Sequence, residues 1–239
     1  MLLPGRRVEW LESVDSTMRA AARLAREGCE HGTIVGADEQ TAGIGRHGNS
    51  WLSEKGSGLY VSMVLRLPRA VPVVMLALGL ATREAIAEVT ALAPDLRWPN
   101  DVLLDSRKCA GILAQLEGDA IIAGIGINVA QASFPADLAT PATSLRMAGA
   151  RVEREEMLRA LVHAVDRYCE ILEESGASAI LSLFEAFSSY ARGRRVRVDQ
   201  NATMIEGITQ GLDSSGFLIV RQDNGQDTTI LAGGVRPCS

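Results

Sequence analysis

The pattern of apolar residues changes near Ala191, and this change constrains the fold more than any other feature of the sequence. Before it, helical stripes and β-branched runs follow one another. After it, a basic stretch at 192–195 leads into short alternating segments at 196–198, 204–209, 217–221 and 228–231. Asn224-Gly225 stands between the last two segments and is typical of a hairpin turn. We therefore predict a domain spanning 1–191 and a small β-barrel domain spanning 192–239.

The larger predicted domain contains strands and helices in mixed order. One helix is expected to begin at Ser16 and end at Gly28, a second to begin at Pro72, and two more to cover 153–174 and 178–190. Strands are expected at 8–11, 33–38, 58–66, 96–98, 102–104, 112–117 and 120–129. This order predicts an α+β fold, with loops over 39–49 and 130–150.

The balance of charge disfavours one broad class of partner. Lys and Arg number 24 and Asp and Glu number 29, which gives a formal net charge of −5. Proteins that bind nucleic acid through their general electrostatic field carry a basic excess instead. We therefore expect no DNA partner held in that way.

Cysteine spacing and apolar runs argue against a metal centre and a membrane location. The four cysteines, at 29, 109, 169 and 238, are scattered without ligand spacing, so we expect no metal held by the protein and free thiols in a reducing cytosol. The longest apolar run, 71–81, is interrupted by Pro72 and is too short to span a bilayer. The N-terminus has no signal-peptide pattern. A soluble, cytoplasmic protein without a membrane partner is expected.

Three segments could carry chemistry. The first, at 40–51, brackets Arg46 between Gly43, Gly45 and Gly48, so that backbone N–H groups can approach an anion that the arginine neutralises. Its spacing matches neither a dinucleotide-binding fingerprint nor a Walker A loop. A mobile surface loop would have the same composition.

The other two segments are RWPND at 97–101, which is followed by RKCAGIL at 107–113, and GIGIN at 124–128. The first of these gathers both charge signs around Lys108, although an exposed hairpin with solvated charges would do the same. Glycines weaken a strand unless another group must come close, either a ligand or a neighbouring helix. No Ser/His/Asp or Cys/His arrangement stands out, so chemistry here would depend on positioning and charge neutralisation.

Taken in this order, the segments resemble those of the biotin protein ligase family. The family pattern is a Ser-Thr pair that opens the first helix, a Gly-Arg loop that ends in Trp, a [KR]WPND turn, a lysine before a GIL strand, and a GxGxN strand. The chain carries these as ST at 16–17, EQTAGIGRHGNSW at 39–51, RWPND at 97–101, RKCAGIL at 107–113 and GIGIN at 124–128, with ATSL at 142–145. The resemblance extends into the C-terminal β-domain and covers nearly the whole chain.

The resemblance implies a fold and a reaction. The fold would be the class II synthetase-like catalytic fold of biotin and lipoate ligases, with a mixed or antiparallel central sheet flanked by helices and an SH3-like C-terminal barrel. The reaction would use ATP and Mg²⁺ to convert biotin to biotinyl-5′-AMP, and would then join the biotin to a lysine of a biotin carboxyl carrier protein. Both steps build negative charge on oxygen, which fixed cations and N–H donors stabilise.

Position by position, the resemblance also implies which residues bind the substrates and which are catalytic. Those expected to contact biotin are Ser16, Thr17, Met18, Gln40, Gly43, Ile44, Gly45, Arg46, Lys108, Gly111, Ile112, Gly124 and Gly126. Those expected to contact ATP or the adenylate are Arg46, Trp51, Asn100, Asp101, Lys108 and Asn128. Arg46, Lys108 and Asp101 would be catalytic, with Lys108 bridging the biotin carboxylate and the α-phosphate.

Two positions depart from the family pattern. Met18 stands where asparagine is usual, and Ile44 replaces the first arginine of the loop, which leaves Arg46 as its only arginine. We expect weaker retention of the adenylate, by about 1–2 kcal/mol if one charge-assisted hydrogen bond is missing.

Alternatives stay open at this point. A lipoate or octanoate ligase or transferase would share the fold, although WPND and Trp51 favour biotin. A non-catalytic biotin or nucleotide sensor is disfavoured by the intact Arg46 and Lys108. Some family members carry an N-terminal helix-turn-helix; because the motifs here begin at Ser16, we expect no operator binding. The sequence allows either a monomer or a homodimer.

Overall fold

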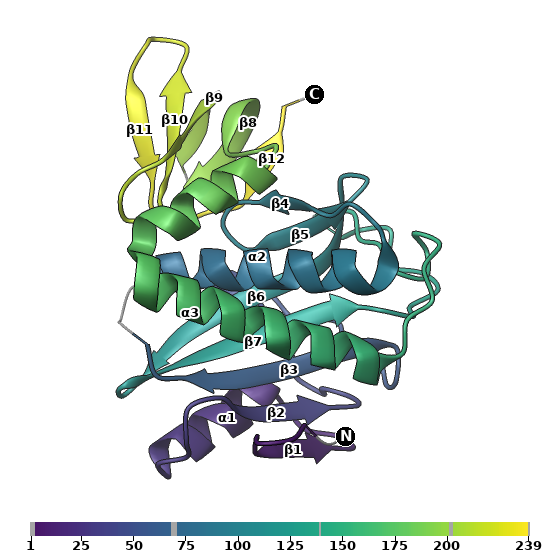
Figure 1. Cartoon of the computed structure of the whole chain (residues 1–239). Coiled ribbons are helices and arrows are strands. Elements are labelled where there is room, and N and C mark those ends of the chain that lie inside the picture. Colours follow the sequence, from purple (N-terminus) through teal and green to yellow (C-terminus); the bar gives the residue numbers. More distant parts are fainter. Residues whose placement is uncertain (1–2, 68–70, 139, 201–202, 239) are drawn as a thin grey trace.

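The computed structural model describes residues 3–67, 71–138, 140–200 and 203–238. Within these ranges the chain forms one sheet of seven strands and one of five (Figure 1). The helices are α1 (Thr17–Arg26), α2 (Val71–Thr90) and α3 (Arg154–Phe187), with a 3-10 turn at Arg46–Gly48. None of the helices in the described ranges is long and apolar enough to cross a membrane.

The larger sheet has the strand order β1-β2-β3-β7-β6-β5-β4. Its strands are β1 (Val8–Leu11), β2 (Thr33–Ala37), β3 (Gly58–Leu65), β4 (Asp95–Arg97), β5 (Asp101–Leu104), β6 (Arg107–Glu117) and β7 (Ala120–Asn128). β1 pairs with β2 in parallel and the other neighbours pair antiparallel. The expected mixed, largely antiparallel central sheet is therefore confirmed.

Side chains alternate between the two faces of this sheet, and each face has its own core. Met63 of β3 and Ile121 of β7 pack in a large core with α2 and α3, which lie side by side across the sheet in Figure 1. Their neighbours Val64 and Ile122 point the other way and pack with α1 in a smaller core. The core on the α1 face is thus smaller than the core on the opposite face.

Helix α3 consists of two helices joined at Gly176. The φ of Gly176 is 75°, in the left-handed region that favours glycine. Two separate helices were predicted here, and the break between them is confirmed. The second helix ends at Phe187 rather than at residue 190, because Ser188 is extended and its hydroxyl donates to the carbonyl of Leu96 at 2.6 Å.

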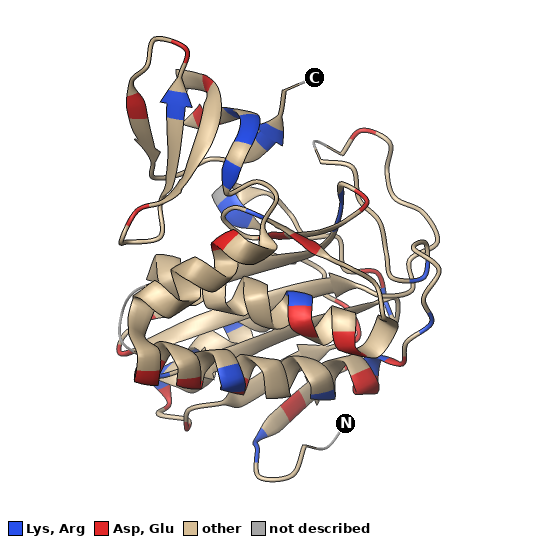
Figure 2. Cartoon of the chain, turned by 45° about the horizontal axis from the view of Figure 1, so that its top comes forward, with Lys and Arg blue, Asp and Glu red and all other residues tan. Residues whose placement is uncertain are grey.

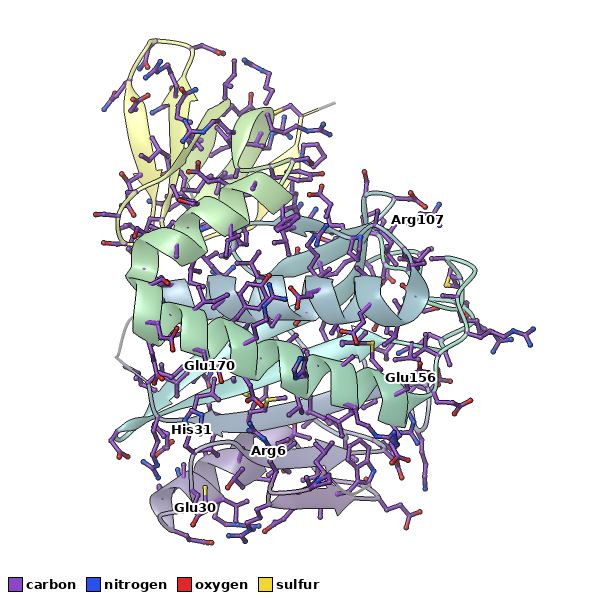
Figure 3. The ribbon with its side chains drawn as sticks, in the orientation of Figure 1. Arg6, Glu30, His31, Arg107, Glu156 and Glu170 are labelled. Carbon is purple, nitrogen blue, oxygen red and sulfur yellow. The ribbon has the colours of Figure 1, made fainter. Side chains whose placement is uncertain are left out.

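Strand β6 begins at Arg107 rather than at the predicted residue 112. The prediction placed the charged pair Arg107-Lys108 before the strand, but the turn is made earlier by Asp105 and Ser106, whose φ angles are 49° and 63°. Strand pairing with β5 resumes directly after this turn. Arg107 is exposed at the tip of the hairpin, where Figure 3 labels it. Lys108 therefore lies inside a strand, and its side chain is only 22% exposed.

The smaller sheet is antiparallel, with the order β11-β10-β9-β8-β12. Its strands are β8 (Arg192–Gln200), β9 (Thr203–Leu212), β10 (Leu218–Gln222), β11 (Asp227–Ile230) and β12 (Val235–Pro237). This arrangement agrees with the expected SH3-like barrel. The predicted Asn224-Gly225 hairpin between β10 and β11 is confirmed, with Gly225 at a φ of 84°. Strand β12 was not predicted, because three residues that include a proline carry no alternating pattern.

Hydrogen bonds fasten the smaller sheet to the larger domain. The indole Nε1 of Trp98 donates to the carbonyl of Gly216 at 2.9 Å, and the backbone N–H of Leu212 donates to Glu185 Oε1 at 2.7 Å. Buried residues of the smaller sheet, including Val196 and Val235, belong to the same core as α2 and α3. The two sheets therefore have a fixed relative position.

Candidate active site

A pocket lies on the α1 face of the large sheet, above the middle of β6 and β7. Gly111 and Leu113 of β6 pair in register with Gly126 and Gly124 of β7, and all four line it. Because three of these four positions lack a side chain, a flat group can lie directly on the sheet backbone.

Two large side chains lie on these glycines in the ligand-free structure. A Cβ placed on Gly126 would come within 2.5 Å of the Trp51 indole, and one on Gly111 within 2.8 Å of it. A Cβ on Gly124 would clash with the sulfur of Met18. Within the described part of the chain, the buried Trp51 Nε1 atom has no hydrogen-bond partner. Trp51 and Met18 thus occupy space over the sheet that is free only because these positions are glycine.

A chain of hydrogen bonds closes the α1 end of the pocket. Both the backbone N–H and the hydroxyl of Thr17 donate to Gln40 Oε1, at 2.9 and 3.0 Å, and the hydroxyl of Ser62 donates to Thr17 Oγ1 at 2.9 Å. Gln40 Nε2 in turn donates to Ser53 Oγ at 2.8 Å. By contrast, Ser16 Oγ is buried and has no hydrogen-bond partner among the residues that the structure describes. A buried hydroxyl left unpaired is costly, so a polar ligand group would stabilise it.

A second, more open cleft lies between the large domain and the small sheet. It shares Gly45, Arg46, Trp51, Asn100 and Lys108 with the first pocket. The pocket and the cleft therefore meet at two cationic side chains, Arg46 and Lys108.

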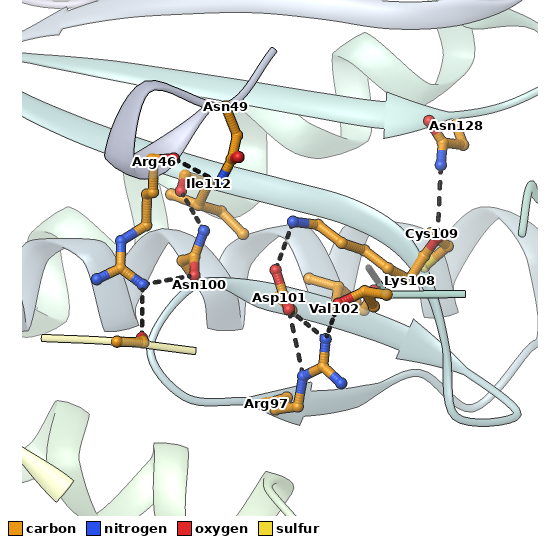
Figure 4. Close-up of polar contacts among 12 residues, drawn as sticks. Arg46, Asn49, Arg97, Asn100, Asp101, Val102, Lys108, Cys109, Ile112 and Asn128 are labelled. Carbon is orange, nitrogen blue, oxygen red and sulfur yellow. Dashed lines mark hydrogen bonds and ion pairs between the residues drawn. The ribbon is translucent and has the colours of Figure 1, made fainter. Parts of the chain in front are cut away.

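Arg46 joins three parts of the chain at this meeting point. Its Nη1 donates to Asn100 Oδ1 at 3.1 Å and to the carbonyl of Gly233, between β11 and β12, at 3.2 Å (Figure 4). Asn100 is itself held by a 3.0 Å bond from its Nδ2 to the carbonyl of Ile112. Burial lowers the pKa of Arg46, and the charge of Asp101 opposes this effect. An arginine nevertheless stays charged at neutral pH.

Lys108 and Arg97 share one carboxylate. Lys108 Nζ lies 2.5 Å from Asp101 Oδ1, whereas Arg97 binds Asp101 Oδ2 through Nη2 at 2.5 Å and Nε at 3.2 Å (Figure 4). Burial acts to raise the pKa of Asp101, but the charges of Lys108 and Arg97 outweigh it and hold that pKa below its ordinary value. Lys108 Nζ is also 5.2 Å from the centre of the Trp51 ring, within cation–π range.

In the ligand-free chain the Asn128 side chain forms hydrogen bonds to the backbone. Its Nδ2 donates to the carbonyls of Thr143 at 3.0 Å and Lys108 at 3.4 Å, and the residue is 4% exposed. It lines neither hollow. These bonds fasten the segment after β7 to β6, and a contact between Asn128 and adenine stays a prediction.

Two family models match the chain. The Biotin/lipoate A/B protein ligase family matches residues 10–131, more than half of the chain, and the Biotin protein ligase C terminal domain matches residues 192–235. The chain belongs to the biotin protein ligase family.

Relatives and solved structures agree with this assignment. The ligase is 33% identical to a biotin–[acetyl-CoA-carboxylase] ligase of Mycobacterium tuberculosis, over 89% of this chain and 81% of that protein. It is 30% identical to the bifunctional ligase/repressor BirA of Bacillus subtilis, over 92% of this chain and 71% of that protein. The biotin protein ligase of Aquifex aeolicus in complex with biotin and ATP superposes with a TM-score of 0.85, at 32% identity, over 97% of this chain and 99% of that one.

The structure of the ligase brings most of the predicted residues together. Those that line the first pocket are Thr17, Met18, Gln40, Ile44, Gly45, Arg46, Trp51, Asn100, Lys108, Gly111, Ile112, Gly124 and Gly126. Ile112 belongs to the core on the opposite face, so it can offer the pocket only its backbone. Asp101 lines the cleft, whereas Ser16 and Gly43 are buried behind the pocket lining.

Sequence reasoning missed the residues that the smaller sheet contributes. Arg197 of β8, Arg236 of β12 and the loop 232–234 line the cleft. The pairing of β8 with β12 depends on a strand that leaves no sequence pattern. Arg97 was also missed as a partner of Asp101, although the spacing of four residues in RWPND could have indicated it.

Proposed function

We propose that the ligase activates biotin with ATP to form biotinyl-5′-AMP and then transfers the biotin to a lysine of a biotin carboxyl carrier protein. The observation that supports this most strongly is the meeting of two hollows at Arg46 and Lys108. A carboxylate that reaches this point from the pocket would meet a phosphate that reaches it from the cleft, between two cations that favour both anions.

In this proposal the biotin rings lie on the glycines of β6 and β7. Ser16, Thr17 and Gln40 would contact the polar ring and its neighbouring atoms, and the unpaired Ser16 hydroxyl favours such a contact. Gly43, Ile44 and Gly45 would surround the biotin carboxylate. Trp51 and Met18 cover the glycines in the ligand-free structure, so both side chains must shift when biotin enters.

The first step joins a biotin carboxylate oxygen to the α-phosphorus of ATP and releases pyrophosphate. Arg46 and Lys108 would neutralise the charge that grows on the phosphoryl oxygens. To do so, Lys108 must exchange its contact with Asp101 for one with the substrate. Mg²⁺ belongs to this proposal as the partner of the ATP phosphates, because Mg²⁺ in such sites is held largely by phosphate oxygens and water.

In the second step the carrier lysine attacks the activated carbonyl, and AMP leaves. Asp101 is a poor general base, because Lys108 and Arg97 hold its pKa low. We therefore assign Asp101 to positioning Lys108 and to attracting the ammonium of the incoming lysine. Asn100 would hold Arg46 and the adenylate in place, while Trp51 and Asn128 would contact the adenine.

We also propose a domain division, a cellular location and a carrier for the ligase. Two separate sheets support the division into a catalytic domain, 1–191, and an SH3-like β-domain, 192–239. The free thiols at Cys29, Cys109, Cys169 and Cys238 agree with a cytoplasmic location. The carrier follows from the names of the relatives, which are ligases of acetyl-CoA carboxylase.

Release of pyrophosphate from ATP tests this function. It should require biotin, should not occur with lipoate, and should end with one biotin on the lysine of an added carrier domain. Release with lipoate instead would favour lipoate or octanoate transfer on the same fold. Biotin binding without any release would favour a sensor.

A further inference from the structure

The charged and the neutral polar groups of the pocket lie at opposite ends. Arg46 and Lys108 stand where the pocket meets the cleft. The α1 end has hydroxyl and amide groups instead, among them those of Thr17 and Gln40. No residue of β2, β3 or β7 is charged, and Figure 2 shows these strands in tan. Recognition at the α1 end therefore depends on neutral hydrogen bonds, whose direction is set by which atoms can donate.

The direction of these bonds follows from one backbone group. The N–H of Thr17 can only donate, so the Gln40 atom that lies 2.9 Å from it is the carbonyl oxygen Oε1. The amide nitrogen Nε2 of Gln40 then faces Ser53 Oγ at 2.8 Å and donates to it. The hydroxyl proton of Ser53 is left for the carbonyl of Trp51, at 3.2 Å. Ser53 thus accepts one bond from Gln40 and donates one to the main chain of Trp51.

The same bonds close the base of the loop 43–51. Within the loop, the backbone N–H of Trp51 donates to the carbonyl of Gly43 at 2.9 Å. The bond from Gln40 to Ser53 lies just outside this pair and joins the residues that precede and follow the loop. Ser53 Oγ also lies against Gly43, where an added Cβ would come within 2.9 Å of it. Ser53 therefore fastens the loop from its base.

Ser53 acts on the pocket only through its neighbours. It is 6% exposed and lines neither the pocket nor the cleft, so it cannot contact a substrate. Gln40 does line the pocket, and the proposed function places it on the polar ring of biotin. A ligand that holds the Gln40 amide therefore also holds Ser53 and the backbone of Trp51. The Trp51 side chain can still turn away from the glycines.

We propose that Ser53 is a positioning residue that couples biotin at Gln40 to closure of the loop 43–51, and so retains the adenylate. The inference rests on the proposed function. The biotin part of the adenylate holds Gln40, Gln40 holds Ser53, and Ser53 keeps the backbone of the loop closed. Arg46 belongs to this loop and therefore stays beside the phosphate until the carrier lysine attacks.

The test compares Ser53→Ala with Ser57→Ala. The Ser57 hydroxyl donates to Glu54 Oε2 at 3.0 Å, so this control removes a hydroxyl just after the same loop. Preformed biotinyl-5′-AMP, chased with excess biotin, should dissociate from Ser53→Ala about 10-fold faster than from wild type, as expected for the loss of one hydrogen bond. The equilibrium affinity for biotin should change much less, because Gln40 keeps its bonds to Thr17. Ser57→Ala should match wild type in both measurements.

A double-mutant cycle shows whether Ser53 acts through Gln40. Rapid mixing measures adenylate dissociation from Gln40→Ala, and the added Ser53→Ala change should speed it little further. A full additional 10-fold in that background would overturn the proposal, because the two residues would then act independently.

Two results with Ser53→Ala alone would also overturn the proposal. One is adenylate dissociation at the wild-type rate. The other is an equal loss of biotin affinity and adenylate retention, which would assign Ser53 to the general folding of the pocket. Failure of the proposed function is distinct, because wild type itself would then release no pyrophosphate with biotin and ATP.

Discussion

Lys108 Nζ lies 2.5 Å from Asp101 Oδ1 in the ligand-free ligase, while Arg97 binds the other oxygen of the same carboxylate. The proposed catalytic cation is therefore held at the meeting point of the two hollows before any substrate arrives. When the substrate binds, Lys108 would exchange its contact with the Asp101 carboxylate for one with the substrate anions. In the proposed function, Asp101 and Arg97 would therefore position Lys108.

Lys108→Ala should lower the rate of biotinyl-adenylate formation by about 10²–10³, the cost of removing one preorganised donor from a developing anion. The affinity for biotin should change much less, because most of the pocket lining is intact. Single-turnover pyrophosphate release and equilibrium biotin binding separate the two effects. Lys55→Ala is the matched control, since Lys55 is exposed and paired with Glu12. A variant that loses biotin affinity but keeps its rate would contradict the role of Lys108.

Asp101→Asn should destabilise the fold by about 3 kcal/mol, because it leaves the buried Arg97 without its counter-ion. Urea unfolding measures this difference in the free energy of unfolding. Since the folded-state pKa of Asp101 is lowered, the ionised carboxylate contributes stability above its unfolded pKa, about 3.9, and loses it as pH falls through the folded value. The gap between wild type and Asp101→Asn should thus be constant from pH 6 to 8 and close below pH 4. A gap that closes near pH 6 would refute the lowered pKa.

Arg46→Gly should release the adenylate before transfer, because it removes a half-buried cation and its bond to the carbonyl of Gly233. Released adenylate should label lysines of any added protein, which mass spectrometry of a bystander detects. The chain itself offers few targets, since its only lysines are Lys55 and Lys108. The bond to Glu12 raises the pKa of Lys55 and so reduces its reactivity. Labelling confined to the carrier would show that Arg46 does not retain the adenylate.

Ile44→Arg should slow adenylate release by about 10-fold, which corresponds to one regained charge-assisted hydrogen bond. Ile44 lines the pocket beside Arg46 and packs only partly against the small core with α1, so the change fits without opening that core. Dissociation of preformed adenylate, followed by chase with excess biotin, gives the rate. Ile44→Leu keeps the apolar character and should dissociate like wild type. Equal dissociation of Ile44→Arg and wild type would mean that this position does not touch the ligand.

Much of this architecture could be predicted because it is local. The Asn224-Gly225 turn and the break at Gly176 follow from residues that tolerate positive φ. The grouping of Gly111 with Gly126 could be expected only through family resemblance, because it depends on the register of β6 against β7. The wall formed by Arg197 and Arg236 depends on a short strand pairing with a distant one. No local pattern encodes that contact.

The measurement that tests the account most directly is the isolation of the enzyme-bound intermediate. The ligase is mixed with biotin and ATP without carrier, separated from small molecules, and analysed by mass spectrometry after denaturation. The account predicts one biotinyl-5′-AMP per wild-type chain and almost none from Lys108→Ala. A carrier domain added to the separated complex before denaturation should receive the biotin on its lysine. Recovery of bound biotin and ATP without any adenylate would contradict the claim that the two hollows meet to join them.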